Sequence, residues 1–203
     1  MDQRRVCVFC GASPGNSAKY ARAAQELGEV LVSADLGLVF GAGGVGIMGA
    51  ISDAVLAAGG EAIGVIPQSL RDREYARDDL SDLRIVSTMH ERKALMHELS
   101  AGFVVLPGGL GTFEEFFEVL TWAQLDLHRK PIVVLDIDGY YQPLVELLDH
   151  ALSSGFMGAA DRALVTVVTS TSEVLATLDR AWDTGPPAGA APARTSDPSP
   201  AEG

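Results

Sequence analysis

The sequence has few basic residues, no long hydrophobic run and no sign of a targeting segment. Its 203 residues include 15 Lys and Arg against 27 Asp and Glu, so the net charge is −12. A protein that follows a nucleic-acid backbone needs a basic surface, which this composition disfavours. No apolar run approaches the roughly 18–20 residues that span a bilayer, and no signal-peptide cleavage pattern follows Met1. We therefore expect a cytoplasmic protein that binds neither nucleic acid nor a membrane.

Few residues are of the types that hold a metal or a cofactor. Cys7 and Cys10 form a single C-x-x-C pair in an apolar stretch typical of a buried strand, where they would point to opposite faces as inert thiols. The four histidines form no H-x-x-x-H pair, so we expect no metal site. None of the three lysines shows a sign of Schiff-base chemistry, and no G-x-S-x-G motif is present. We therefore expect cofactor-free chemistry.

Short apolar runs alternate with longer amphipathic segments along most of the chain. The runs predict strands at residues 5–10, 36–40, 62–66, 83–87, 102–106, 131–135 and 164–168. The amphipathic segments predict helices at residues 17–34, 45–58, 89–100, 111–125, 140–154 and 172–182. Most strands lack polar alternation, as parallel strands covered on both faces do. The order of elements predicts a doubly wound, mostly parallel α/β sheet with helices on both faces.

One domain accounts for this pattern. Hydrophobic residues make up 47% of the chain, which is ordinary for a folded domain of this length. The pattern stops near residue 183, and residues 184–203 hold five of the ten prolines together with Ala, Gly and Ser. We predict a domain at 1–183 and a disordered tail at 184–203.

Glycines are concentrated in two places, each directly after a predicted strand. The first cluster, residues 41–49, contains a G-x-G-x-x-G motif that by itself favours a dinucleotide site. The strand at 62–66 lacks the acidic residue that would hold a ribose hydroxyl, which argues against NAD. The glycines then permit either a tight turn with close helix packing or the approach of a nucleotide to the backbone. We favour the second interpretation.

The second cluster is Pro107-Gly108-Gly109-Leu110-Gly111-Thr112, between a strand and a helix. Its glycines can turn several backbone N–H groups toward one point, and the helix N-terminus adds partial positive charge. The helix-end field contributes about 0.3–1 kcal/mol, whereas each hydrogen bond to a charged group contributes roughly 1.5–3 kcal/mol. We predict a phosphate cradle in which direct N–H bonds dominate.

Two interpretations compete for Glu115. The segment 112–115 reads T-x-x-E, a capping box in which Glu115 would only satisfy a backbone N–H. The alternative is a catalytic carboxylate. Glu114 and Glu118 lie close by, so the segment carries more carboxylates than a cap needs, which favours catalysis.

A third feature is the predicted helix start at Met89-His90-Glu91-Arg92-Lys93, which Thr88 is suited to cap. Its two basic residues could form a solvated turn. Because this helix follows a neighbouring strand end, Arg92 could instead face the same crevice as the second glycine cluster. An arginine fork pairs well with phosphate or carboxylate.

In these motifs the sequence resembles the LONELY GUY (LOG) family. The likeness is carried by Pro107-Gly108-Gly109-x-Gly111-Thr112-x-x-Glu115, Met89-His90-x-Arg92-Lys93 and Gly43-Gly44-x-Gly46-Ile47-Met48-Gly49. Residues 121–125 and the Asp138-Gly139-Tyr140-Tyr141 segment add to it, so it covers nearly all of 5–182. Departures are small: Ile47 stands where Leu is commoner, and the proline-rich tail lies outside the pattern.

The resemblance implies a Rossmann-like fold without a bound dinucleotide, usually as a homodimer. It implies hydrolysis of the N-glycosidic bond of cytokinin riboside 5′-monophosphates to free cytokinin base and ribose 5-phosphate. It also implies catalytic roles for Arg92 and Glu115. The substrate contacts that it implies come from Glu74, Arg92, Lys93, Gly109, Leu110, Gly111, Thr112, Phe113, Glu114, Glu115 and Thr121.

The chemistry of the bond fits these residues. Departure of a purine from C1′ builds oxocarbenium charge on the ribose, which a nearby carboxylate stabilises. Glu115 would do this and orient or deprotonate the attacking water, while the glycine loop grips the 5′-phosphate. The same site would serve an AMP nucleosidase of purine salvage, or a protein that binds nucleotides without turnover. A lysine decarboxylase that uses pyridoxal phosphate is the weakest alternative, since no cofactor lysine is evident.

Overall fold

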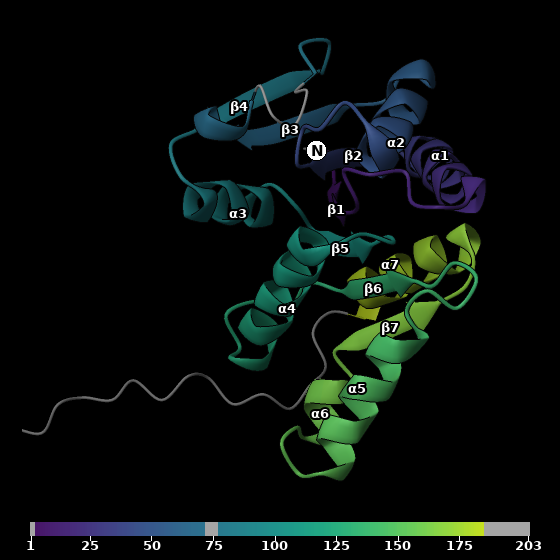
Figure 1. The fold of residues 1–203 in the computed structure, drawn as a ribbon, viewed down its shortest axis with the longest axis vertical. Helices are drawn as coiled ribbons and strands as arrows, with labels where there is room; N and C mark the ends of the chain where they lie inside the picture. The colour runs from purple at the N-terminus through teal and green to yellow at the C-terminus, as the bar shows by residue number, and fades with distance from the viewer. Residues whose placement is uncertain (1–2, 72–76, 185–203) are drawn as a thin grey trace, which may run out of the picture.

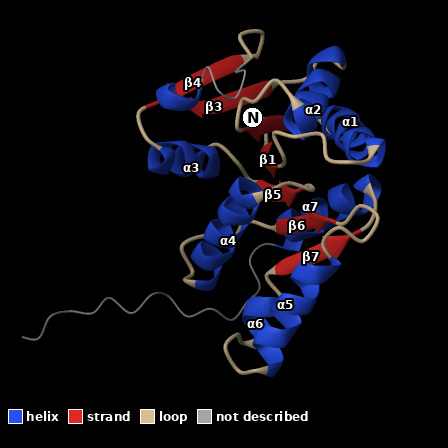
Figure 2. Ribbon diagram, viewed as in Figure 1, coloured by secondary structure: helices blue, strands red, loops and turns tan. Residues whose placement is uncertain are grey.

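The computed structural model describes residues 3–71 and 77–184, in which a parallel sheet lies between two layers of helices (Figures 1 and 2). The described part has seven strands in the order β4-β3-β2-β1-β5-β6-β7, and every neighbouring pair is parallel. Their bounds are β1 (Arg5–Phe9), β2 (Gly37–Phe40), β3 (Ala62–Pro67), β4 (Asp82–Val86), β5 (Gly102–Val105), β6 (Ile132–Leu135) and β7 (Val165–Val168).

The helices form the two outer layers. They are α1 (Ala18–Ser33), α2 (Gly46–Ala57), α3 (Met89–Glu98), α4 (Leu110–Gln124), α5 (Gln142–Ser153), α6 (Ala159–Arg162) and α7 (Thr171–Thr184), with a 3-10 turn η1 (Gln68–Leu70). One apolar core joins the sheet to α1, α2 and α7, and a second core on the opposite face joins it to α3, α4 and α5. None of the described helices has both the length and the apolar composition that crossing a membrane requires.

The predicted fold class is confirmed. Each predicted strand and helix is present with ends displaced by no more than two residues. Among the elements that the structure describes, the sequence pattern missed only the short η1 and α6. Helix α7 reaches Thr184, one residue past the predicted domain boundary, and residues 185–203 of the predicted tail lie outside the described residues. The strands were recognisable because burial on both faces makes them continuously apolar.

The two cysteines lie on opposite faces of the sheet. Cys7 belongs to the core under α3, α4 and α5, and Cys10 belongs to the core under α1, α2 and α7. Both are buried free thiols, and burial, followed by the charge of Glu115, raises the pKa of each. Both thiols therefore remain protonated, as expected for inert core residues.

The strand order reverses between β1 and β5. The chain leaves β1 through α1 toward β2, and it returns after β4 to place β5 on the other side of β1. Loops leaving these two strands diverge to opposite faces, so they open a crevice beyond the carboxyl ends of β1 and β5. The fold therefore places a ligand site where the second glycine cluster begins.

A cluster of aromatic and basic side chains lies in the core between α3, α4 and the start of β5. The ring of His97 stacks on Phe103 with centroids 5.6 Å apart and approaches the ring of His128 at 4.9 Å. The His128 Nδ1 accepts a hydrogen bond from the Lys130 N–H at 3.1 Å, so its Nε2–H donates to the Val119 carbonyl at 2.8 Å. This arrangement requires a neutral His128 ring.

Protonation of this cluster opposes folding. Burial, followed by the charge of Lys130, lowers the pKa of His97 from 6.5 to about 4, and burial also lowers the pKa of His128. Between the unfolded and folded pKa values of His97, 6.5 and about 4, the unfolded chain binds more protons than the folded chain. The free energy of unfolding should therefore rise with pH from about 4 to 6.5 and level off above, by at most about 1.4 kcal/mol per pH unit for each histidine.

We predict that His97→Phe flattens this dependence, because phenylalanine keeps the ring packing and binds no proton. The His97 Nε2 has no hydrogen-bond partner among the described residues, so the substitution removes no bond from that atom. Urea unfolding measured between pH 5.0 and 7.5 tests this, with His150→Gln on the exposed side of α5 as the control. Equal slopes in wild type and His97→Phe between pH 5.5 and 6.5 would contradict it.

Candidate active site

A pocket of about 550 Å³ occupies the crevice between β1 and β5. Such a volume suits a ligand of nucleotide size. Loops after both strands and the first turns of α2, α3 and α4 enclose it. The lining residues used below are Cys10, Gly11, Ile47, Met48, Arg92, Gly108, Gly109, Gly111, Thr112, Glu114, Glu115 and Tyr140.

The first turn of α4 presents backbone N–H groups that have no partner in the described part of the chain. The helix begins at Leu110 with Gly109 as its N-cap, and no side chain caps it. No described residue accepts a hydrogen bond from the N–H of Gly109, Leu110, Gly111 or Thr112. A Cβ added at Gly109 or at Gly111 would meet nothing within 4 Å, so the space beside these residues is open. This turn is therefore available to bind an anion.

The first turn of α2 differs, because the protein itself supplies an acceptor for two of its N–H groups. The Gly11 carbonyl accepts hydrogen bonds from the N–H groups of Ile47 at 3.0 Å and Met48 at 3.2 Å. Gly46 has φ +65°, and a Cβ there would lie 2.3 Å from the Ala12 carbonyl oxygen. The residues of this cluster that line the pocket are Ile47 and Met48, not its glycines. The geometry thus supports the packing interpretation of the first cluster and not the nucleotide contact that we favoured.

Glu115 lies on the stripe of α4 that faces the pocket. It follows Gly111 by four residues and Thr112 by three, and all three line the pocket. Helical side chains tilt toward the N-terminus, so the carboxylate reaches back toward the cradle from about 7 Å along the helix axis. Thr112 is the third residue of the helix and Gly109 is its cap, so the T-x-x-E capping box does not form.

Arg92 faces the same pocket from the first turn of α3. Thr88 caps this turn by accepting a hydrogen bond from the Glu91 N–H at 3.1 Å, as expected. The Arg92 side chain is buried, and its Nη2 donates to the Gly41 carbonyl at 3.0 Å. A Cβ at Gly41 would lie 2.0 Å from that Nη2, so the glycine leaves the space that the guanidinium occupies. Arg92 is the one basic side chain among the described lining residues.

Lys93 does not line the pocket, and it links α3 to α4. Its ammonium contacts the Glu114 carboxylate and lies 2.9 Å from the Glu118 carboxylate. Burial alone would lower the pKa of Lys93, but the two carboxylates together outweigh burial and raise it. Lys93 therefore stays charged and holds together the two helices that carry Arg92 and Glu115.

The remaining predicted substrate contacts do not line the pocket or lie outside the described residues. Leu110 and Phe113 belong to the cradle segment, but neither side chain lines the pocket. Thr121 is exposed on α4, where its hydroxyl donates to the Phe117 carbonyl at 2.7 Å, and it is also outside the pocket. Glu74 lies outside the described residues.

Sequence reasoning missed the part of the pocket that follows β1. Residues 10–15, Tyr20, Leu70, Met89 and Tyr140 also line it. The rule that ligands bind beyond the carboxyl ends of strands at the reversal point would have indicated residues 10–15. Tyr140 reaches the pocket through the turn before α5, and nothing in the sequence pattern indicated that it would line the pocket.

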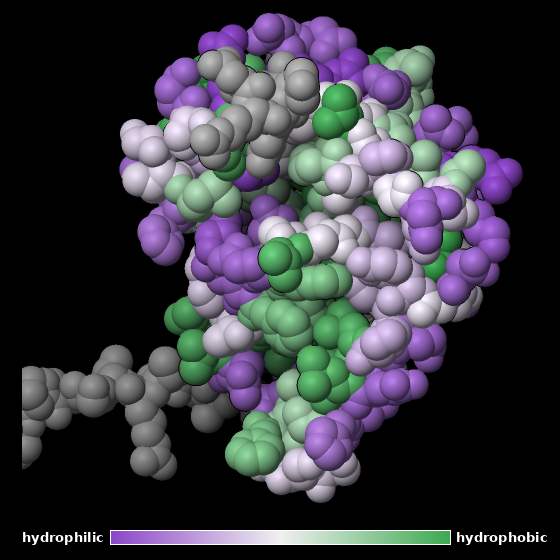
Figure 3. Space-filling view, viewed as in Figure 1, coloured by the Kyte–Doolittle hydropathy of each residue, from purple (hydrophilic) through white to green (hydrophobic). Residues whose placement is uncertain are grey.

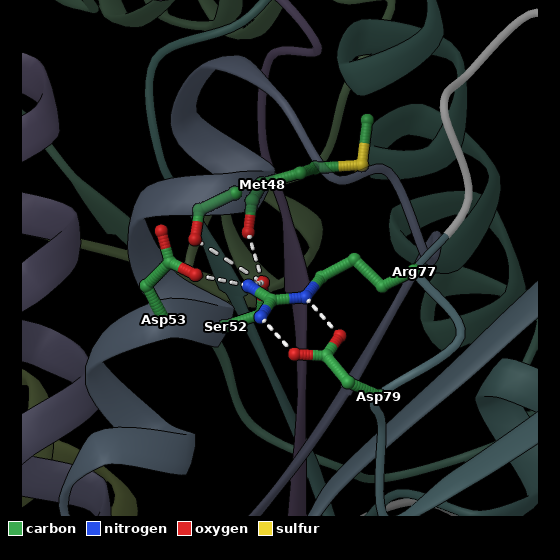
Figure 4. A network of polar contacts seen from close by, with 6 residues as sticks. Met48, Ser52, Asp53, Arg77 and Asp79 are labelled. Carbon is green, nitrogen blue, oxygen red and sulfur yellow. Dashed lines mark hydrogen bonds and ion pairs between the residues drawn. The ribbon is translucent and has the colours of Figure 1, made fainter.

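A partly buried arginine, Arg77, lies at the centre of a polar network beside the pocket (Figure 4). Arg77 binds both oxygens of Asp79 at 2.8 and 2.6 Å, contacts Asp53 and donates to the Ser52 hydroxyl at 3.2 Å. The Ser52 hydroxyl in turn donates to the Met48 carbonyl at 3.0 Å. The guanidinium lowers the pKa of Asp79, which keeps the pair charged. This network holds the chain after residue 76 against α2 beside the pocket-lining Met48.

The chain matches a known family over most of its folded part. The sequence profile of a family described as "Possible lysine decarboxylase" matches residues 48–178. This chain is 46% identical to "Probable cytokinin riboside 5′-monophosphate phosphoribohydrolase LOGL5" of Oryza sativa subsp. japonica over 176 residues. The match covers 87% of this chain and 72% of that relative. The chain is 44% identical over the same length to "Cytokinin riboside 5′-monophosphate phosphoribohydrolase LOG1" of Arabidopsis thaliana, of which the match covers 83%.

Solved structures support the fold. A molybdenum cofactor carrier protein from Chlamydomonas reinhardtii superposes with a TM-score of 0.69 at 20% identity, over 90% of this chain and 99% of that one. At this identity the likeness concerns the fold alone. The Rossmann-like sheet with a pocket at its reversal point defines the class of doubly wound α/β proteins that bind ligands beyond the carboxyl ends of their strands. Within that class, the chain belongs to the LONELY GUY (LOG) family.

The word decarboxylase in the family description finds no support in the pocket. A pyridoxal phosphate enzyme needs a lysine beside its cofactor. The chain has three lysines, all within the described residues, and none lines the pocket. Lys93 pairs with carboxylates, Lys130 donates to the His97 carbonyl at 2.6 Å, and Lys19 pairs with Asp138.

We predict that Lys93 is chiefly a structural residue. Lys93→Ala leaves two neighbouring carboxylates of α4, Glu114 and Glu118, without their shared partner on α3, and it should lower the free energy of unfolding by about 1–3 kcal/mol. The control is Lys19→Ala, since the Lys19–Asp138 pair at 2.7 Å is 50% and 61% exposed, against 10% and 22% for Lys93 and Glu118. Lys19→Ala should cost less than about 1 kcal/mol. Equal losses in urea unfolding would contradict this role.

Proposed function

We propose that this chain hydrolyses the N-glycosidic bond of cytokinin riboside 5′-monophosphates, releasing the free base and ribose 5-phosphate. One observation carries the proposal: the pocket contains the unpartnered N–H groups at the start of α4 and, on the same helix stripe, the carboxylate of Glu115. The N–H groups suit a phosphomonoester, and the carboxylate suits a carbon that gains positive charge. The relatives named above bear the name of this activity.

The cradle binds the end of the substrate that does not react. Backbone N–H groups of Gly109 to Thr112 hold the 5′-phosphate, and its binding energy positions the sugar. The axial offset of about 7 Å between Leu110 and Glu115 matches the reach of a ribose from its 5′-phosphate to C1′. The phosphate therefore fixes C1′ near the carboxylate.

Glu115 acts on the reacting end. As the bond between C1′ and the purine nitrogen breaks, the electron pair leaves with the base and C1′ becomes oxocarbenium-like. The carboxylate stabilises that charge and takes a proton from the water that attacks C1′. The departing base gains the equivalent of that proton, so the net change is the addition of one water and the products are neutral base and ribose 5-phosphate.

Arg92 supplies positive charge at the pocket wall. Its guanidinium is held by the Gly41 carbonyl and so is preorganised before a substrate arrives. In a protein with a net charge of −12, this local charge favours entry of a dianionic phosphomonoester. Its role therefore depends on the space that Gly41 leaves.

A homodimer in the cytoplasm forms part of the same proposal. Exposed apolar side chains gather over α4 and α5 in Figure 3, and those on or just after α4 are Leu110, Phe117, Leu125 and Leu127. A concentration of exposed apolar side chains on one helix favours an interface. Thr121 lies on this surface, outside the pocket of its own chain, so its implied substrate contact requires a second copy. Two free thiols fit a reducing compartment.

Comparison of three substrates tests the activity. Isopentenyladenosine 5′-monophosphate should be split into free base and ribose 5-phosphate with a higher kcat/KM than AMP. The corresponding nucleoside lacks the phosphate that the cradle binds, so its kcat/KM should be at least about 100-fold lower. This factor corresponds to the loss of two hydrogen bonds to a charged group. A higher kcat/KM for AMP would instead indicate a salvage nucleosidase, and no release of base from any nucleotide would indicate a binding protein.

Replacement of one carboxylate tests the mechanism. Glu115→Gln should lower kcat by at least about 100-fold, the usual contribution of an acid–base group, with little change in stability. Glu118→Gln is the matched control, because Glu118 lies on the same helix, binds Lys93 and does not line the pocket. It should keep kcat within a few-fold. Near-normal turnover by Glu115→Gln would remove the catalytic assignment.

A further inference from the structure

Two consecutive tyrosines bind the loop that forms the phosphate cradle. The Tyr140 hydroxyl donates to the Gly108 carbonyl, and the Tyr141 hydroxyl donates to the Leu106 carbonyl at 2.6 Å. Both tyrosines come from the Asp138-Gly139-Tyr140-Tyr141 segment before α5, which the proposed reaction leaves without a task. The two hydrogen bonds connect the turn after β6 to the turn after β5.

The Tyr140 bond fixes the orientation of one peptide group. The structure has no cis peptide among its described residues, so the Gly108 carbonyl and the Gly109 N–H point in opposite directions across one plane. A carbonyl held by Tyr140 therefore turns the Gly109 N–H away from Tyr140. That N–H has no acceptor among the described residues, and Gly109 lines the pocket. Glycines on both sides of this peptide would otherwise let it rotate easily.

The turn that carries Tyr140 is itself well anchored. The buried Asp136 carboxylate accepts hydrogen bonds from the Tyr141 N–H at 2.8 Å and from the Gln142 side chain at 2.9 Å. The next residues, Asp138 and Gly139, adopt φ values of +59° and +77°, which reverse the chain. A hydroxyl presented from so constrained a turn can hold a neighbouring peptide in place.

We propose that Tyr140 is a positioning residue that locks the Gly108–Gly109 peptide, so that the Gly109 N–H is directed at the 5′-phosphate before the substrate binds. This inference rests on the proposed function. It assigns the hydroxyl an effect on phosphate affinity, through preorganisation of a donor, and no role at C1′. Loss of the hydroxyl should therefore weaken every ligand that carries the phosphate and leave phosphate-free ligands unaffected.

Tyr141 provides a matched control. Its hydroxyl makes the same type of bond to the same loop, but the residue after Leu106 is Pro107, which has no N–H to orient. Loss of the Tyr141 hydroxyl, which is buried, should lower stability without a specific loss of phosphate affinity. The two substitutions to phenylalanine separate positioning of a donor from general support of the loop.

The experiment measures binding of ribose 5-phosphate by calorimetry to wild type, Tyr140→Phe and Tyr141→Phe, with the Tm of each. Tyr140→Phe keeps the ring, including its edge contact with Tyr20 at 5.8 Å. Its Kd should rise about 10-fold, the lower range for one hydrogen bond to a charged group. Tyr141→Phe should bind within about 2-fold of wild type although its Tm falls. With the nucleotide substrate, Tyr140→Phe should raise KM by a similar factor and change kcat by less than about 3-fold.

The possible results are distinct. Binding by Tyr140→Phe equal to wild type overturns the positioning role and leaves the proposed function intact. Equal weakening in both variants also overturns it, because the effect then reflects support of the loop. No binding of ribose 5-phosphate by wild type overturns the phosphate cradle, and the proposed function with it. A loss confined to Tyr140→Phe supports the inference.

Discussion

The site depends on a small set of backbone N–H groups for which residues 3–71 and 77–184 supply no acceptor. Polar groups at a helix start need a partner, and at α2 the Gly11 carbonyl supplies one. At α4 no described residue does so for Gly109 to Thr112. We propose that an anion completes this turn, so that phosphate binding follows from how β1 and β5 present their loops. In the proposed reaction, catalysis then depends on the distance between this turn and the Glu115 carboxylate, which lies on the same helix stripe.

Several residue choices around the pocket follow from this requirement. A Cβ at Gly108 would lie 2.1 Å from the Thr112 hydroxyl and 2.9 Å from the Gly11 nitrogen, so the loop after β5 can approach the loop after β1 only with glycine there. Gly41 leaves room for Arg92 in the same way. The two glycine clusters therefore have different tasks. The second exposes its backbone to the pocket, and the first makes space for a charged side chain and for helix packing.

The fold could be predicted from the sequence more fully than the site. Continuous apolar runs and amphipathic helices have periods that burial imposes, so the strands and helices were located to within two residues. The second glycine cluster and Arg92 were predicted to face one crevice because their residue types are suited to anions, and both line the pocket. Lys93 looked like a ligand, but its partners on α4 become neighbours only through packing between helices. Tyr140 was not recognised as part of the pocket, because a hydroxyl that acts on a peptide 32 residues away leaves no local pattern.

The most direct test of the central claim follows the backbone amides themselves. Two-dimensional NMR of the labelled protein, titrated with ribose 5-phosphate to saturation, reports on each N–H separately. We predict large downfield shifts for the amide protons of Gly109, Leu110, Gly111 and Thr112. The signals of Ile47 and Met48 should stay nearly unchanged, because their N–H groups already donate to the Gly11 carbonyl. Saturation with shifts at Ile47 and Met48 and none at Gly109 to Thr112 would contradict the account.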